Sequence, residues 1–175
     1  MKMFIFFQLF LALFTFSSVL GAMPGLSLVG QGSTYYMGFI KVYDARLYGD
    51  TTYSSDSILK NQSSTCLSLD YAVAIKAEDL IKSAEKILSK QHDKKILDAF
   101  SKEIFTIHNA YEDVEAGDNY TLCYSAEKQE TTLVYNSSEV AAIKNEDFGA
   151  IYFGIWLGDN NVIDNKLKKQ LLEQR

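Results

Sequence analysis

The spacing of the apolar residues changes abruptly at Glu78, and this change limits the chain to folds that join a sheet to helices. Before Glu78, apolar residues occupy every second position, which is typical of a strand with one buried face. They are Leu67, Leu69, Tyr71, Val73 and Ile75. After it, apolar residues recur three and four positions apart, which indicates an amphipathic helix. They are Leu80, Ile81, Ala84, Ile87 and Leu88. A half-buried strand that leads into such a helix needs a sheet and a helical layer in one core.

Further strands and one more helix are expected on both sides of this point. Alternation and turn residues predict strands over residues 26–30 and 36–48, separated by a turn at 30–33, and a β-hairpin over 120–135. Residues 49–63 are rich in Ser, Thr, Asp and Asn and predict a loop. A second helical pattern covers residues 96–108.

The C-terminal part predicts two more helices and holds the only tryptophan, Trp156. The first helix begins near Asp147 and is expected to end at Gly158, because glycine adopts the left-handed helix-ending conformation most easily. Asp164 is then placed to cap a second helix, whose leucines at 167, 171 and 172 point inward. With 175 residues the chain has room for one domain. The order of elements predicts an α+β fold, an antiparallel sheet with a layer of helices on one face.

The first residues have the pattern of an export signal. Lys2 supplies a positive start, residues 4–16 are mostly apolar, and residues 19–22 offer small side chains for cleavage. We expect residues 1–22 to be a signal peptide and residues 23–175 to form a periplasmic or secreted domain without stable membrane insertion. An uncleaved anchor is the alternative, because the apolar region can be extended to the roughly 20 residues that span a bilayer.

Charge and cysteine content narrow the choice of partners. The net charge is −5 and the lysines are scattered, so we expect no nucleic-acid partner. Cys66 and Cys123 lie in expected strands, each on the side of small polar residues. A cross-strand disulfide can form in an oxidising compartment, but the sequence favours two separate buried thiols, because nothing in it shows that these strands are neighbours. Two cysteines and two histidines without ligand spacing predict no metal site, and nothing predicts a cofactor.

Three segments resemble the bacterial chalcone isomerase-like proteins. Residues 38–48, GFIKVYDARLY, are similar to the family's Gly-Phe-x-Val-Tyr-x-Ala-x-Leu-Tyr strand with one residue inserted. Residues 114–118, VEAGD, resemble its turn before the hairpin. Residues 153–159 followed by 167–172 resemble its C-terminal signature. The resemblance implies an open-faced sandwich, an antiparallel sheet carrying helices, which agrees with the order of elements.

The resemblance also raises the question of catalysis. Plant chalcone isomerases close a chalcone to a flavanone, which needs hydrogen-bond donors directed at a developing enolate. Where the family has its arginine and two threonines, this chain has Pro24, Met37 or Gly38, and Ile155. The tyrosine and asparagine of the helical region have no clear counterpart. We therefore expect no chalcone cyclisation and assign no catalytic residue.

Other members of this fold bind fatty acids without catalysis, so the resemblance implies an exported protein that binds a fatty acid or a similar small apolar ligand. A sheet covered by amphipathic helices can enclose an apolar cavity in which one or two polar groups bind a carboxylate. Arg46 is the expected cation, and Tyr43, Tyr48 and Tyr36 are the expected hydroxyl donors. The alternative for Arg46 is a surface ion pair with Asp44 on the same strand face.

Other conspicuous residues have simpler interpretations. Trp156 lies in an apolar helix and is expected in the core rather than in a ligand wall. His92 and His108 lack a nucleophile motif and are expected at helix ends. Glu78 and Asp79 suit the start of a helix because its dipole favours acids there. Two further functions stay open: an isomerase or intramolecular lyase of unknown substrate, and an envelope protein whose exposed sheet face contacts a partner.

Overall fold

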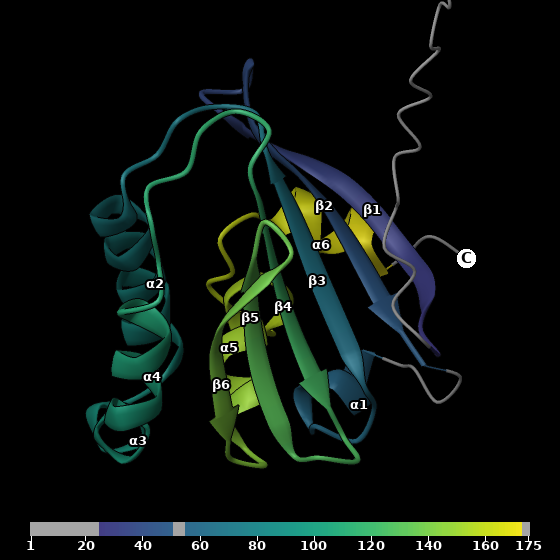
Figure 1. Cartoon of the computed structure of the whole chain (residues 1–175), viewed down its shortest axis with the longest axis vertical. Coiled ribbons are helices and arrows are strands. Elements are labelled where there is room, and N and C mark those ends of the chain that lie inside the picture. The colour runs from purple at the N-terminus through teal and green to yellow at the C-terminus, as the bar shows by residue number, and fades with distance from the viewer. Residues whose placement is uncertain (1–24, 51–54, 173–175) are drawn as a thin grey trace, which may run out of the picture.

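The computed structural model describes residues 25–50 and 55–172, which form one sheet with helices packed on it (Figure 1). The strands are β1 (Ser27–Tyr36), β2 (Ile40–Gly49), β3 (Thr65–Tyr71), β4 (Asn119–Ser125), β5 (Glu130–Tyr135) and β6 (Ser138–Lys144). All neighbouring strands pair antiparallel, and the order in the sheet is the order in the sequence. The expected α+β class with an antiparallel sheet is confirmed.

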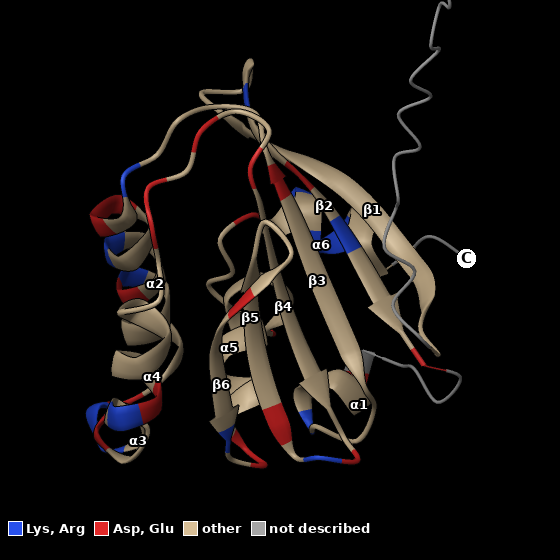
Figure 2. Cartoon of the chain, viewed as in Figure 1, with Lys and Arg blue, Asp and Glu red and all other residues tan. Residues whose placement is uncertain are grey.

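The helices form two groups. They are α1 (Ser55–Leu59), α2 (Ala77–Gln91), α3 (Lys94–Ala99), α4 (Ser101–His108), α5 (Phe148–Leu157) and α6 (Asn165–Leu172). Helices α1, α5 and α6 lie behind the sheet in Figure 1, whereas α2, α3 and α4 lie together beyond its β6 edge. Charged residues gather on this second group, and α5 carries none (Figure 2). Helix α5 is therefore the central core helix, and α2 packs against it from the side.

The sheet buries one face and leaves the other without a helical cover. Residues of the central strands that face α5 are almost completely buried, among them Ala45, Leu47, Leu67, Leu69, Leu122 and Leu133. From α5, Phe148, Tyr152 and Phe153 are fully buried against them. Because strand side chains alternate, the intervening residues point to the other face, where most are polar. This uncovered surface is called the outer face below.

The first hairpin differs from the expectation. Gly30–Ser33 form no turn, and β1 runs straight through them because α6 packs closely over the two glycines there. A Cβ on Gly30 would lie 2.2 Å from the backbone oxygen of Leu171. The reversal lies instead at Met37 and Gly38, which both have positive φ angles, 51° and 81°. The glycines of β1 thus serve close packing with α6 rather than a turn.

Two short elements were not expected from the sequence. Helix α1 lies within the segment predicted as a loop, and it is fixed by Ile58, of which only 2% is exposed. Strand β6 lies between the expected hairpin and α5, and its inward residues include the small Ala141. The strand after Thr65 also stops at Tyr71, although Ile75 still pairs with Val114 through an isolated bridge.

The C-terminal helices begin and end where the sequence predicts, but the reason why a glycine ends α5 is not the expected one. Helix α5 ends at Gly158, but the φ angle of Gly158 is −59°, so the expected left-handed conformation is wrong. Glycine is needed there for space, because a Cβ would lie 2.6 Å from the carbonyl oxygen of Gly154. Asp164 does cap α6, since its Oδ1 accepts hydrogen bonds from the amides of Lys166 and Leu167.

A disulfide joins Cys66 and Cys123 in the structure. The two residues lie directly opposite each other on β3 and β4, with their Cα atoms 4.1 Å apart. They alternate with the buried Leu67 and Leu122, so the disulfide belongs to the outer face.

Within the described residues, none of the helices is long and apolar enough to cross a membrane. The expected signal peptide lies outside the described residues.

Candidate functional site

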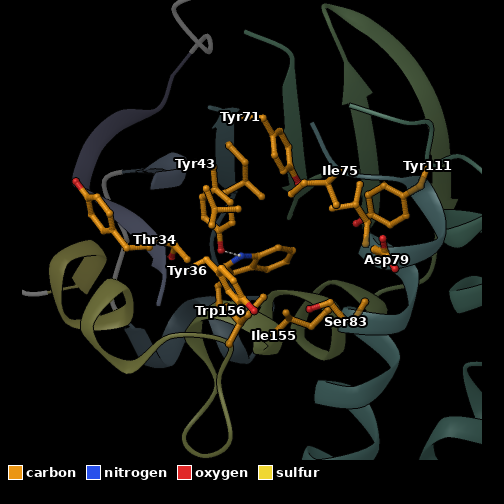
Figure 3. A pocket seen from close by; sticks show the side chains of 16 residues that line it. Thr34, Tyr36, Tyr43, Tyr71, Ile75, Asp79, Ser83, Tyr111, Ile155 and Trp156 are labelled. Atoms are coloured by element: carbon orange, nitrogen blue, oxygen red, sulfur yellow. Dashed lines mark hydrogen bonds between the residues drawn. The ribbon is translucent and has the colours of Figure 1, made fainter. Parts of the chain in front are cut away.

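A cavity of about 350 Å³ lies between the first three strands, α2 and α5. Most of its wall is apolar or aromatic (Figure 3). The sheet contributes Thr34, Tyr35, Tyr36, Val42, Tyr43, Leu69 and Tyr71; the helices and loops contribute Ile75, Asp79, Leu80, Ser83, Ala84, Tyr111, Ile155, Trp156 and Ile163. Cavities of this size and lining are typical of sites for small molecules. We name it the main cavity.

A chain of hydrogen bonds links the floor of the main cavity to the start of α6. The indole Nε1 of Trp156 donates to the Tyr43 hydroxyl at 3.3 Å (Figure 3). The Thr34 hydroxyl donates to Asp164 at 3.2 Å, the same carboxylate that caps α6. Burial raises the pKa of the Tyr43 phenol, and its hydrogen bonds with Thr34 and Trp156 partly oppose this rise. Tyr43 is therefore a neutral phenol fixed at the cavity wall.

Two further phenols face the main cavity from β3 and from the loop after α4. Burial raises the pKa of both Tyr71 and Tyr111 well above the ordinary value. The hydroxyl of Tyr152 donates to that of Tyr111 at 3.1 Å, which leaves the hydrogen of Tyr111 free for another acceptor. Both phenols are neutral near pH 7, so they can donate or accept hydrogen bonds.

Helix α2 supplies the wall opposite the sheet. It begins at Ala77, and residues one turn apart on it, Leu80 and Ala84, add apolar surface. Ser83 adds a hydroxyl, and Asp79 places a carboxylate at the solvent-exposed rim. Within the described residues, the lining of the main cavity contains no lysine, arginine or histidine.

The four residues expected to bind a ligand are divided between the two faces of the sheet. Tyr43 and Tyr36 line the main cavity. Arg46 and Tyr48 do not, because they alternate with the buried Ala45 and Leu47 and so point to the outer face. Two of the four residues therefore line the main cavity, and strand alternation separates the other two from it.

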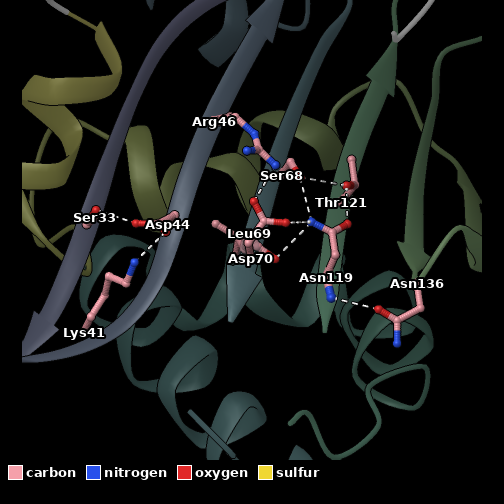
Figure 4. Close-up of polar contacts among 10 residues, drawn as sticks. All are labelled: Ser33, Lys41, Asp44, Arg46, Ser68, Leu69, Asp70, Asn119, Thr121 and Asn136. Carbon is pink, nitrogen blue, oxygen red and sulfur yellow. Dashed lines mark hydrogen bonds and ion pairs between the residues drawn. The ribbon is translucent and has the colours of Figure 1, made fainter. Parts of the chain in front are cut away.

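Arg46 belongs to a polar network on the outer face (Figure 4). Its guanidinium forms an ion pair with the carboxylate of Asp70. The alternative partner expected from the sequence was Asp44. The amide nitrogen of Asn119 donates to Asp70 at 2.9 Å and to Ser68 at 2.8 Å. Asp44 instead accepts from Lys41 at 2.8 Å. Arg46 thus holds neighbouring strands together through their side chains.

The β1–β2 hairpin carries exposed apolar side chains next to the mouth of the main cavity. Tyr36, Met37 and Phe39 are 64%, 71% and 73% exposed. Tyr35 and Tyr36 belong both to this tip and to the cavity lining. The mouth of the cavity is therefore apolar as well as its interior.

The histidines lie away from the main cavity. His108 closes α4 and is one wall of a second, more open hollow of about 540 Å³ between α2, α3 and α4. Its Nδ1 lies 3.8 Å from a carboxylate oxygen of Glu85, and burial lowers its pKa. His92 is the residue that ends α2. The described part of the chain holds no cluster of His, Cys, Asp and Glu that suits a metal ion.

Several cavity residues were not expected from the sequence. Trp156 was expected in the core rather than in a ligand wall, and it is both 8% exposed and part of the cavity lining. Tyr71 and Tyr111 carry no local signal, since each reads as an ordinary apolar position. Asp79 was explained only by the helix dipole, which favours acids at the start of a helix. For Leu69 and Tyr71, the alternation of the strand had already indicated that their side chains face the helical layer.

The fold and cavity together define a class: a sheet with one helical cover and an apolar cavity between the two layers. Chalcone isomerase-like proteins form a family whose sequence model matches residues 20–173. The chain belongs to this family.

One solved structure with the same fold is a fatty-acid-binding protein of Arabidopsis thaliana. The TM-score is 0.68 at 10% sequence identity, over 86% of this chain and 88% of the plant chain. No curated protein matches this chain in sequence. The position that the resemblance assigns to a catalytic threonine, Ile155, lines the main cavity with an apolar side chain.

Proposed function

We propose that this protein is a non-catalytic carrier that holds one small, largely apolar molecule, such as a fatty acid, in the main cavity. The observation that carries the proposal is the cavity itself, with aromatic walls from the sheet, α2 and α5. A water-sized group occupies about 30 Å³. The volume of about 350 Å³ therefore suits a molecule of about a dozen heavy atoms, and a longer chain can leave through the apolar mouth.

The polar groups of the main cavity support binding better than catalysis. Trp156 and Tyr43 are hydrogen-bonded to each other, and Tyr111 is fixed by Tyr152. A catalytic acid or base needs a pKa near the working pH. The phenols at this site have raised pKa values and stay protonated, so they can orient a ligand but give up no proton near pH 7.

Export is the second part of the proposal. It is supported by the leader-like pattern of residues 1–22 and is compatible with the disulfide between Cys66 and Cys123, because oxidising compartments preserve such bonds. N-terminal sequencing of the protein purified from its host tests it. A mature chain that begins near Met23 is the expected result, and a retained N-terminus in a cytosolic fraction would contradict it.

Native mass spectrometry of the protein from its own host tests the carrier function. A bound small apolar molecule that is released on unfolding is the expected result. Added ligand should also change the fluorescence of Trp156, since the only tryptophan lines the main cavity. An empty protein with no fluorescence response to apolar ligands would refute the proposal.

A matched pair of variants on α2 locates the binding site. Ser83→Phe places a ring in the main cavity and should weaken ligand binding by about tenfold or more, because the ring occupies ligand volume. Ser89→Phe makes the same change on the same helix, but Ser89 faces the second hollow. Equal affinities in the two variants would place the ligand outside the main cavity.

A further inference from the structure

The charges around the main cavity are unusual for a site that would hold an anion. The only charged side chain in its described lining is the carboxylate of Asp79. Lys82 lies near Asp79 but is 64% exposed and closest to Glu78, at 3.3 Å. Arg46 pairs with Asp70 on the outer face. The parts of the chain outside the described residues contain only two cations, Lys2 and Arg175.

Apart from the indole of Trp156, the other polar side chains of the main cavity carry hydroxyls. Tyr71, Tyr111 and Ser83 offer such hydroxyls from β3, the loop after α4, and α2. The phenol of Tyr111 accepts from Tyr152, so its own hydrogen is available to an acceptor in the cavity. Such groups can satisfy one alcohol, ketone, ester or amide through ordinary hydrogen bonds.

An ionised carboxylate loses its hydration when it enters a largely apolar cavity. Without a buried cation this loss is not compensated, whereas a neutral polar group loses far less. The carboxylate of Asp79 at the rim adds repulsion to any incoming anion. Neutral ligands avoid both costs.

From this lining we propose that the polar group of the bound ligand is uncharged, and that a fatty acid enters the main cavity only as the neutral acid. The inference rests on the proposed carrier function and specifies its ligand class. A long-chain alcohol, an ester or a neutral ketone fits this class, and a fatty-acid anion does not.

Two probes of equal chain length test the inference: 1-decanol and decanoate. Trp156 fluorescence reports binding of either probe to the full mature protein. A carboxylic acid with an ordinary pKa near 4.3 is ionised at pH 8. At that pH we expect decanol to bind at least tenfold more tightly than decanoate. The affinity for total decanoate should rise as the pH falls to 5.5, because the neutral fraction increases, while that for decanol should change much less.

A charge variant and its control sharpen the test. Asp79→Asn removes the rim carboxylate. The ratio of the affinities for decanol and decanoate at pH 8 should fall by about twofold, which is the effect of one screened charge at roughly 10 Å. Glu78→Gln removes a neighbouring carboxylate that does not line the cavity and is paired with Lys82 at 3.3 Å, so it should change the preference less than Asp79→Asn does.

The outcomes separate this inference from the carrier function. Decanoate binding as tightly as decanol at pH 8 would overturn the uncharged-ligand inference and leave the carrier function standing. If neither probe binds and the native protein holds no apolar molecule, both fail.

Discussion

The close contact between β1 and α6 gives a prediction whose size follows from the structure. In Gly30→Ala the added Cβ would lie 2.2 Å from the backbone oxygen of Leu171, whereas an ordinary C···O contact is about 3.3 Å. The two backbones must therefore separate by about 1 Å. Neither atom belongs to a flexible side chain, so no rotamer change relieves the contact.

The cost depends on how far α6 moves. Overpacking of a well-packed contact costs about 1–3 kcal/mol. If α6 leaves the sheet, the fully buried Leu167 and Leu171 lose their cover, at about 1.5–3 kcal/mol each. We therefore expect Gly30→Ala to lower the free energy of unfolding by about 3 kcal/mol.

Urea denaturation followed by Trp156 fluorescence measures this loss. Gly154→Ala is the matched control: the same Cβ is added inside α5, and its nearest atom is a side-chain oxygen of Gln91 at 3.3 Å. Alanine is favoured over glycine inside a helix by up to about 1 kcal/mol, so Gly154→Ala should cost much less than Gly30→Ala. Equal losses in the two variants, or a loss below about 0.5 kcal/mol for Gly30→Ala, would refute the reasoning.

Three further predictions concern the disulfide, a buried histidine and the outer face. Replacing Cys66 and Cys123 by alanine should lower the free energy of unfolding by about 4 kcal/mol, because the disulfide closes a loop with a sequence separation of 57; a loss below about 1 kcal/mol in urea would contradict this. Burial lowers the pKa of His108 from 6.5, with Glu85 opposing the shift, so the unfolded chain binds the proton more readily. The free energy of unfolding should therefore fall from pH 7 to pH 5, and His108→Gln should flatten that fall; an unchanged pH dependence in this variant would exclude His108 as its source. Arg46→Met should leave ligand affinity unchanged in the Trp156 fluorescence titration, since Arg46 lies outside the main cavity; a severalfold weaker affinity would place the ligand on the outer face.

Periodicity predicted the long elements of the fold but not the short ones. Strand β3 and helix α2 each show a clean period over several turns or pleats, and both were located from the sequence. Helix α1 is a single short stretch whose one fully buried side chain, Ile58, is hidden among polar residues. The glycines of β1 suggested a turn because close packing against a distant segment, α6, leaves no local trace.

The site was less predictable because it depends on which strand face meets the helices. Tyr43, expected as a hydroxyl donor, lies on the strand face that meets the helices, but Arg46 was chosen for its charge and lies on the opposite face. The phenols of Tyr71 and Tyr111 meet only in three dimensions, across the loop that joins β3 to α2 and the one that follows α4. No pattern of residue spacing in the sequence indicates that these two side chains lie close together.

The disulfide on the outer face has a practical consequence for proteolysis. Cys66 and Cys123 enclose the whole of α2, α3 and α4, so one wall of the main cavity lies within a covalently closed loop. A protease that cuts once inside this loop, for example in the exposed turn at Asp93, releases no fragment. The nicked chain should migrate as one band on a non-reducing gel and as two on a reducing gel. The two fragments made by a single cut in this loop therefore stay joined through the disulfide between β3 and β4.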